Sequence, residues 1–243
     1  MNTPPEYIVI LSLWKRGEWL EEQVDLFTNQ TVPPKEVWIC HGLNSENSHF
    51  LEDLENKVDR ILTIEDGGSV FSRFEMARDS KENLFFIIDD DMFPTENYCE
   101  KCLHFYERFS KKEKDCIIGS SGRIFKTDKY FPNTMLGSVN YSNFSKVDIG
   151  TNGWFLSGES IECMLDNHIT NGYNNCEDIA LSYLNRGKRE VDTYVIKQGP
   201  HINSDKYKHR RGFGDEALSH QQNHTEFYKQ RNEVLRFYRE VLK

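Results

Sequence analysis

The sequence lacks several features that would assign it to a well-defined class. No apolar run approaches the roughly 20 residues that a membrane-spanning helix needs. The N-terminal stretch MNTPPEYIVILSLW has neither a basic region nor a small-residue cleavage site, so it does not resemble a signal peptide. Internal repeats, low-complexity segments and domain linkers are also missing. We therefore expect one domain over residues 1–243, in a cytoplasmic protein that is at most peripheral to a membrane.

Positive charge is scarce. The 243 residues include 30 Lys and Arg against 39 Asp and Glu, which gives a net charge of −9. General nucleic-acid binders usually carry a basic field that meets the phosphates, so we expect no nucleic-acid partner. Hydrophobic residues make up 37% of the chain and aromatic residues 13%, which is enough apolar material to form a folded core.

The six cysteines do not form a metal or disulfide motif. Cys99 and Cys102 are a lone CxxC pair, without the second pair or the nearby histidines that a zinc site needs. The pair lies inside an amphipathic helical pattern, whereas a thioredoxin-like pair lies at a helix start after a strand. Without a secretion signal, disulfides are not expected, and we interpret the cysteines as ordinary thiols.

The first half of the chain alternates between strand and helix patterns. Short apolar runs typical of strands buried on both faces occur at 7–13, 36–40, 59–64 and 84–88. Helical patterns follow them at 16–29, 50–58, 70–78 and 95–110. This order predicts an α/β fold with a mostly parallel sheet flanked by helices. Ligands bind such sheets beyond the carboxyl ends of the strands, which here are Trp14, His41, residues 65–68 and residues 89–91.

The second half is less regular. We expect strands at 116–119, 123–126 and 192–196, a short apolar segment at 153–156, and a turn-rich polar stretch at 127–150. Helical patterns occur at 160–165 and 177–185, and a long amphipathic helix closes the chain at 216–242. The expected architecture is therefore a parallel first half, a mixed second half and a C-terminal helix.

The strongest chemical signal is Ile87-Ile-Asp-Asp-Asp-Met-Phe-Pro94. Three carboxylates at the end of a buried strand repel one another and need compensation. In an extended chain Asp89 and Asp91 point to the same side, because side chains alternate with a period of two. Two hard oxygen ligands suit Mn²⁺ or Mg²⁺, and a bound diphosphate would complete the coordination. The alternative interpretation is a solvated acidic turn.

This strand and its Asp-x-Asp ending resemble the GT-A glycosyltransferases, especially the family 2-like group. Four further segments carry the resemblance: Gln30-Thr-Val-Pro-Pro-Lys-Glu-Val-Trp-Ile39, Arg73-Phe-Glu-Met-Ala-Arg78, Gly150-Thr-Asn-Gly-Trp-Phe155 and Asn175-Cys-Glu-Asp-Ile-Ala-Leu-Ser182. Their order and spacing make the match more specific than any one segment. The resemblance implies a GT-A type, Rossmann-like fold. Residues 1–94 would be the nucleotide-sugar-binding half, 95–200 the acceptor-side half, and 201–243 a C-terminal loop and helix.

The resemblance also implies roles for donor-side residues. Asp89 and Asp91 would bind the divalent ion and the donor, with Asp90 between them and Arg73 near the diphosphate. The metal would neutralise charge on the leaving nucleoside diphosphate. A charge on a surface helix is the alternative for Arg73. Trp154 would stack on a sugar face, or else be a core tryptophan.

Two acceptor-side carboxylates begin a predicted helix, where the helix dipole favours negative charge, so capping alone could explain one of them. These are Glu177 and Asp178, and in the resembling family the Asp of the pair deprotonates the acceptor hydroxyl. His201 would be a third metal ligand through a neutral imidazole. The basic run at 206–211 is either a loop that closes over the diphosphate or a solvated surface.

We therefore predict a metal-dependent, inverting glycosyltransferase that moves one sugar from a nucleotide-diphosphate donor, of UDP or GDP type, to a glycan or other hydroxyl acceptor. The processive members of the family carry a Gln-x-x-Arg-Trp motif that this chain lacks, which favours single sugar addition. The second strand ends in Cys40-His41-Gly42 without the acidic residues that often contact the nucleobase there. The alternatives are a sugar-phosphate nucleotidyltransferase and a non-catalytic carbohydrate-binding protein.

Overall fold

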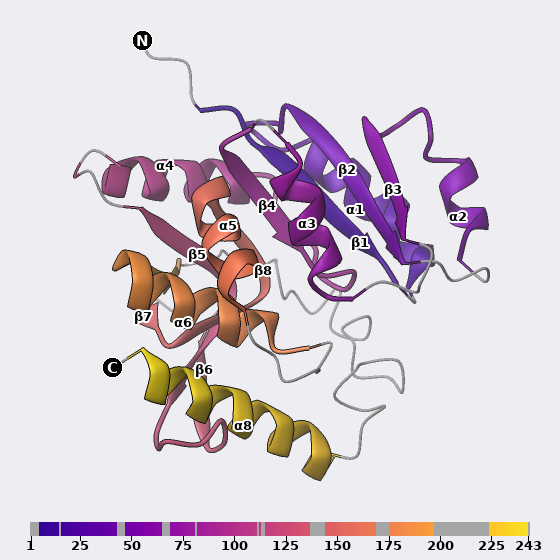
Figure 1. Ribbon diagram of the computed structural model, residues 1–243. Coiled ribbons are helices and arrows are strands. Elements are labelled where there is room, and N and C mark those ends of the chain that lie inside the picture. The colour runs from indigo at the N-terminus through magenta and orange to yellow at the C-terminus, as the bar shows by residue number, and fades with distance from the viewer. Residues whose placement is uncertain are drawn as a thin grey trace.

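A computed structural model describes residues 5–14, 16–42, 47–64, 69–80, 82–110, 112, 115–136, 144–168, 175–196 and 224–242. The described strands form one nine-stranded sheet in the order β3-β2-β1-β4-β8-β5-β9-β7, with β6 paired to β5 (Figure 1). The strands are β1 (Ile8–Leu13), β2 (Glu36–Gly42), β3 (Arg60–Ile64), β4 (Leu84–Ile88), β5 (Cys116–Phe125), β6 (Asn133–Leu136), β7 (Ser145–Val147), β8 (Ile149–Ser157) and β9 (Asp192–Val195).

The first four strands are parallel to one another, as the alternating pattern predicts. β1 pairs with both β2 and β4, and β2 pairs with β3. All five residues of β4 are buried, and β1 is buried except at Ser12, because helices cover both faces of the sheet. The chain runs outward from β1 through β2 to β3 and then returns to the other side of β1 for β4. This reversal forms a topological switch point between β1 and β4, where open α/β sheets bind ligands.

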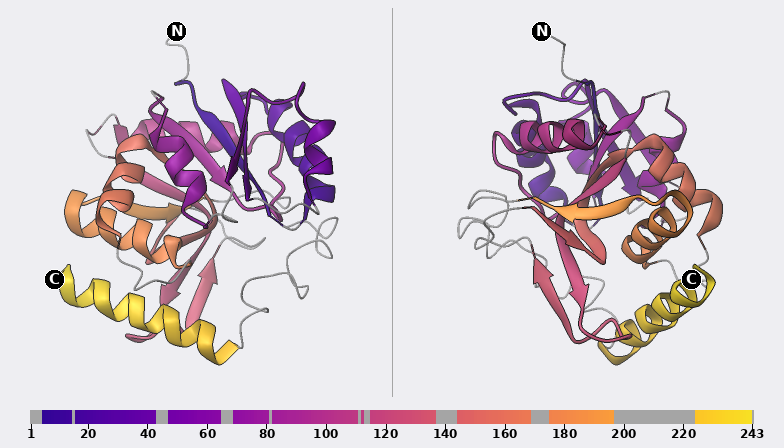
Figure 2. Two further views of the ribbon diagram at one scale, coloured as in Figure 1. Left: turned by 45° about the vertical axis from the view of Figure 1, so that its right-hand side comes forward. Right: turned by 90° about the vertical axis from the view of Figure 1, so that its left-hand side faces the viewer.

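The helices divide between the two faces of the sheet, and the right-hand view of Figure 2 shows helices on both sides. They are η1 (Gly17–Trp19), α1 (Leu20–Thr28), α2 (His49–Glu52), α3 (Ser72–Arg78), α4 (Tyr98–Ser110), α5 (Gly158–Asn167), α6 (Glu177–Arg189) and α8 (His224–Val241). Apolar residues of α1 and α4 share one buried cluster with the sheet. Apolar residues of α3, α5, α6 and α8 share the cluster on the opposite face.

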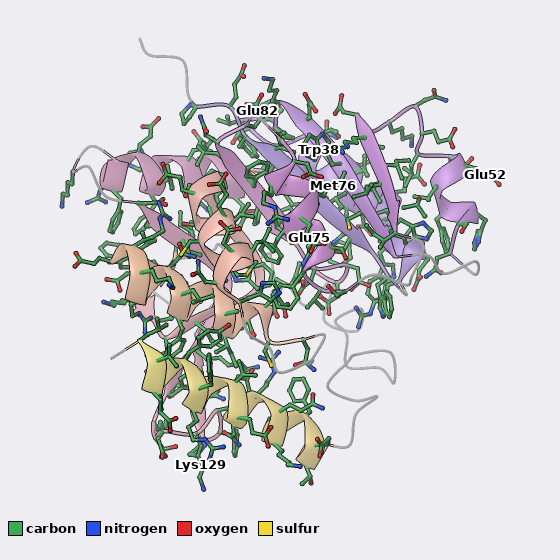
Figure 3. All side chains as sticks on the ribbon, viewed as in Figure 1. Trp38, Glu52, Glu75, Met76, Glu82 and Lys129 are labelled. Carbon is green, nitrogen blue, oxygen red and sulfur yellow. The ribbon has the colours of Figure 1, made fainter. Side chains whose placement is uncertain are left out.

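The packing of α3 determines which way its polar residues can face. Met76 and Ala77 belong to the same buried cluster as Trp38 of β2, and Figure 3 labels Met76 on α3 and Trp38 on β2. Phe74 is fully buried and packs against Trp154 of β8, with ring centroids 5.6 Å apart. These contacts hold α3 on the sheet beside the switch point, which brings its first turn, including Arg73, toward the carboxyl end of β4.

The second half is mixed, as predicted, but several local expectations need correction. β8 runs antiparallel between β4 and β5, while β9 is parallel to β5. The two strands expected at 116–119 and 123–126 are the single strand β5. The stretch 127–150, expected to be turns, contains β6 and β7, whose pairing with β5 and β9 supplies the backbone hydrogen bonds that their short sequences do not signal.

Two predicted helices also differ in extent. The helix expected at 50–58 is only His49–Glu52, followed by turns that lead into β3. The C-terminal helix is described from His224 to Val241, and residues 216–223 of the prediction lie outside the described residues. α8 lies across one end of the molecule, beside α6 and the β5–β6 hairpin (Figure 1). None of the helices in the described ranges is long and apolar enough to cross a membrane.

Candidate functional site

The acidic triplet lies directly at the switch point. β4 ends at Ile88, which is opposite Leu11 of β1 and Gly153 of β8. The backbone N–H of Asp89 donates to the carbonyl oxygen of Asn152 at 3.1 Å, so the start of β8 holds the triplet in place. Asn152 has a φ of 68°, in the left-handed region. Such strained residues gather at functional sites. The carboxylates therefore lie at the carboxyl end of β4, where the sequence places them.

The three carboxylates do not share one direction, because Asp90 and Asp91 lie in a turn instead of an extended strand. Asp89 accepts a hydrogen bond from Arg73, while Asp90 turns inward to an ion pair with Arg16. Asp91 Oδ2 lies 3.7 Å from Arg16 Nη1. The prediction that Asp89 and Asp91 point to the same side of an extended strand is therefore wrong. Their side chains nevertheless remain partly open, at 30% and 22% exposure.

Arg73 connects the triplet to the start of α6. Its Nη1 donates to Asp89 Oδ1 at 2.5 Å and to Ser12 Oγ at 3.2 Å, and its Nη2 donates to Glu177 Oε1 at 3.1 Å. The guanidinium is only 7% exposed, so the alternative of a charge on a surface helix is wrong. One buried cation thus joins a strand end, a neighbouring strand and the start of α6.

Trp154 packs its indole ring against the Arg73 guanidinium. The indole is 1% exposed and donates from Nε1 to the carbonyl oxygen of Gly150 at 2.9 Å. The Arg73 guanidinium carbon lies 5.0 Å from the centre of the indole ring, a cation–π distance. A ring this buried has no free face for a sugar, so the structure favours the core interpretation of Trp154. Its link to the site is through Arg73.

The two carboxylates that begin α6 each have their own guanidinium. Cys176 precedes the helix with a φ of 75°, and Glu177 and Asp178 follow in its first turn, as predicted. Glu177 accepts from Arg73, as described above. Asp178 accepts from Arg231 Nη1 through both oxygens, at 2.8 Å each. The structure therefore brings Asp89, Arg73 and Glu177 together, and it places Asp178 beside them in a pair with α8.

Burial shifts the pKa of two carboxyls in this region. Burial raises the pKa of Glu177 to about 7; the negative charge of Asp178 adds to the shift, and Arg73 and Arg231 oppose it. Burial likewise raises the pKa of Asp90 to about 7; Arg16 opposes the shift, while Asp91 and Asp89 add to it. Carboxyls that titrate near neutral pH are common at catalytic sites because they can exchange a proton under working conditions.

Sequence reasoning missed three residues of the site. Arg16 follows β1 at the switch point, and the rule about strand ends could have found it. Gln23 of α1 donates from Nε2 to the carbonyl oxygens of Asp89, at 2.9 Å, and Met92, at 2.8 Å, so it fixes the acidic turn. Arg231 had no local signal, because it is one of several cations on an amphipathic helix.

Two predicted features cannot be placed. His201 and the basic run at 206–211 lie outside the described residues. Within the described ranges, no group of three or more His, Cys, Asp or Glu side chains is arranged to hold a metal ion. The cysteines in those ranges are free thiols, and Cys99 and Cys102 are fully buried.

Comparison with known proteins identifies the fold. No protein-family model matches the chain, and no curated protein sequence matches it either. Among solved structures, it is similar to S. aureus TarS residues 1–349, with a TM-score of 0.56 and 11% identity over 79% of this chain and 60% of that chain. At this identity the likeness shows a shared fold.

Two ligand complexes of the same TarS fragment also match. The complex with UDP has a TM-score of 0.55 at 11% identity, over 81% of this chain and 62% of that chain. The complex with UDP-GlcNAc has a TM-score of 0.54 at 12% identity, over 82% and 61%. The chain therefore spans about three fifths of the length of the TarS fragment, and its α/β fold is the one that TarS uses.

Proposed function

We propose that the chain is a GT-A type, nucleotide-sugar-dependent glycosyltransferase that transfers a single sugar to an acceptor hydroxyl. The observation that carries this proposal is the Arg73 bridge, which joins Asp89 at the end of β4 to Glu177 at the start of α6. The bridge lies at the switch point of a fold shared with TarS, a glycosyltransferase whose complexes contain UDP and UDP-GlcNAc. These complexes support a UDP-type donor as the first one to test.

The donor is proposed to bind at the carboxyl ends of β1 and β4. Trp14 follows β1 and is 38% exposed, and we propose its indole as the surface on which a nucleobase stacks. Arg16 and Arg73 place positive charge on either side of the acidic turn. They limit the repulsion among its carboxylates and provide cations for a diphosphate.

The residues fit Mg²⁺ or Mn²⁺ as an ion that binds together with the donor. Asp89 and Asp91 supply two partly exposed carboxylates, and proteins typically hold Mg²⁺ with one or two carboxylates plus substrate phosphates. His201 stays a proposed additional ligand. When bound, the ion would stabilise negative charge on the leaving diphosphate. Arg73, which donates to Asp89, would fix the orientation of that carboxylate when the ion is bound.

The acceptor hydroxyl is proposed to lose its proton to Asp178. The oxygen of the acceptor hydroxyl attacks the anomeric carbon while the bond from that carbon to the diphosphate breaks. The bonding electron pair leaves with the nucleoside diphosphate. A direct displacement of this kind inverts the anomeric configuration. Glu177, next to Asp178 and held by Arg73, sets the charge around the base.

The proposal is tested with a panel of UDP- and GDP-hexoses in thermal-shift and nucleotide-release assays, with and without Mn²⁺. Binding to the native state alone raises stability by about 2.7 kcal/mol at a ligand concentration of 100 times Kd. We expect a donor and Mn²⁺ together to stabilise the protein more than either does alone, and slow release of the nucleoside diphosphate when water is the acceptor.

Asp91→Ala should lose the Mn²⁺-dependent part of the shift. Asp128→Ala is the matched control, because Asp128 is exposed in the turn between β5 and β6. If no nucleotide sugar binds or is hydrolysed by the wild type, the proposal is wrong. Pyrophosphate release from a nucleoside triphosphate and a sugar phosphate would indicate a nucleotidyltransferase. Sugar binding that is indifferent to EDTA, without turnover, would indicate a carbohydrate-binding protein.

A further inference from the structure

The C-terminal helix inserts a cation into the acceptor side of the site. Arg231 lies 53 residues after Asp178 in the chain, and its Nη1 donates to Oδ1 and Oδ2 of that carboxylate at 2.8 Å each. Both side chains are buried, at 10% and 5% exposure. α8 therefore contributes a buried ionic contact to the site as well as its apolar face.

Two aromatic rings hold the Arg231 guanidinium in place. Its carbon lies 4.9 Å from the ring centre of Tyr130 and 4.7 Å from that of Phe227. Asn232, the next residue of α8, accepts a hydrogen bond from the Tyr130 backbone N–H at 2.7 Å. Because a guanidinium confined by packing loses few further rotamers on pairing, Arg231 is preorganised for the carboxylate.

Each of the two carboxylates at the start of α6 contacts a different guanidinium. Glu177 and Asp178 are adjacent buried carboxylates, and each would raise the energy of the other's charged form. Arg73 of α3 contacts Glu177, and Arg231 of α8 contacts Asp178. Arg73 is already shared with Asp89, so without Arg231 a single cation would face three carboxylates.

The contact still leaves Asp178 able to accept a proton. A carboxylate has about four lone-pair sites. Oδ1 accepts from Arg231 and from the Ile179 backbone N–H, at 2.8 Å each, while Oδ2 accepts from Arg231 alone among the described residues. Oδ2 thus keeps a lone-pair site for a hydroxyl proton while Arg231 fixes the orientation of the carboxylate.

We propose that Arg231 is the positioning residue for the catalytic base: by holding both oxygens of Asp178, it makes the docking of α8 a condition for deprotonation of the acceptor hydroxyl. This inference rests on the proposed function. It assigns to α8 a part in the chemical step and no part in donor binding, because Arg231 contacts neither the acidic turn nor Arg73 among the described residues.

The test compares Arg231→Ala with Arg236→Ala, a control on the same helix whose side chain is exposed. Donor binding and steady-state nucleotide release are measured on the full chain, with the nucleotide sugar that the wild type hydrolyses fastest. We expect Arg231→Ala to lower kcat by about 100-fold, the lower range for general base catalysis, with donor Kd changed by less than about twofold. Arg236→Ala should match the wild type.

Three further measurements separate positioning from a purely structural role. Added guanidinium ion should restore part of the kcat of Arg231→Ala. The kcat of Arg231→Lys should lie between those of Arg231→Ala and the wild type. Asp178→Asn combined with Arg231→Ala should be no slower than Asp178→Asn alone, because residues that act as a unit are not additive. If Arg231→Ala does not fold, Arg231→Lys carries the test, with reduced kcat and unchanged donor Kd expected.

The outcomes distinguish the two proposals. If the wild type releases nucleotide and Arg231→Ala (or, where that does not fold, Arg231→Lys) keeps its kcat, the role of Arg231 is wrong and the proposed function stands. Multiplicative effects in the double variant, or failure of guanidinium to rescue a folded Arg231→Ala, also overturn the role of Arg231. Absence of any wild-type turnover overturns both.

Discussion

Removal of Arg73 should destabilise the protein by an amount that depends on pH. The guanidinium is 7% exposed and pairs with Asp89 and Glu177, whose side chains are 30% and 11% exposed. Loss of one partner from a buried ion pair costs about 3–5 kcal/mol, because the remaining charge stays desolvated. We expect Arg73→Ala to lower the free energy of unfolding by that amount at pH 8, because both Asp89 and Glu177 lose their cation.

The pH dependence follows from the raised pKa of Glu177. The pKa of Glu177 is about 7 in the folded state, against an ordinary value of 4.5. Such a group contributes its full stabilisation below pH 4.5, and this contribution is lost as the pH rises through 7. Arg73 opposes the shift, so its removal raises the pKa of Glu177 further. At pH 5.5 Glu177 is neutral in both the wild type and the variant, so its charge adds nothing to the cost of the substitution. At pH 8, one unit above a pKa of about 7, the charge of Glu177 can add at most about 1.4 kcal/mol, so the effect at pH 8 should exceed that at pH 5.5 by about 1 kcal/mol.

Urea denaturation at pH 5.5 and pH 8, in EDTA, measures both values. Arg78→Ala is the matched control, because it removes an arginine from the same helix. Arg78 pairs with Asp166 at 3.5 Å on the surface, where the two side chains are 41% and 67% exposed. Such pairs contribute about 0–1 kcal/mol. An Arg73→Ala effect equal to the Arg78→Ala effect, or the same at both pH values, would refute the reasoning.

Three other substitutions test separate parts of the structure. Glu177→Gln should remove the loss of stability that the wild type shows between pH 4.5 and 7. In urea denaturation above pH 7 the variant should be more stable than the wild type, by up to about 3 kcal/mol. Equal pH profiles of the two proteins would contradict this. Gly153→Ala should cost about 1–3 kcal/mol, because its Cβ would lie 2.8 Å from Ser120 Oγ, whereas Gly158→Ala, whose nearest contact is 3.5 Å, should cost little. Trp14→Ala should weaken UDP binding by about 10- to 100-fold in calorimetry, as expected for loss of a base-stacking ring, and an unchanged Kd would remove Trp14 from the donor site.

The sequence was most informative where apolar periodicity and strand ends coincide. The four parallel strands were predicted to within about two residues at each end, because buried strands need continuous apolar runs. The acidic triplet was placed correctly at the carboxyl end of β4, because it directly follows that apolar run. Predictions were less accurate for β6, β7 and α2, because these short elements depend on partners elsewhere in the sheet or end in turns. The division into donor and acceptor halves stays a prediction.

The sequence by itself determined which residues carry charge at the carboxyl end of β4 and at the start of α6, because both positions follow from local patterns. Only the tertiary structure decided how those charges are paired. Arg73 is 16 residues from Asp89 but 104 from Glu177, and Arg231 is 53 residues from Asp178. No local pattern encodes contacts at such separations. They arise because the strand order places β1, β4 and β8 side by side, and because α3, α6 and α8 bury their apolar residues in one cluster on the same face of the sheet.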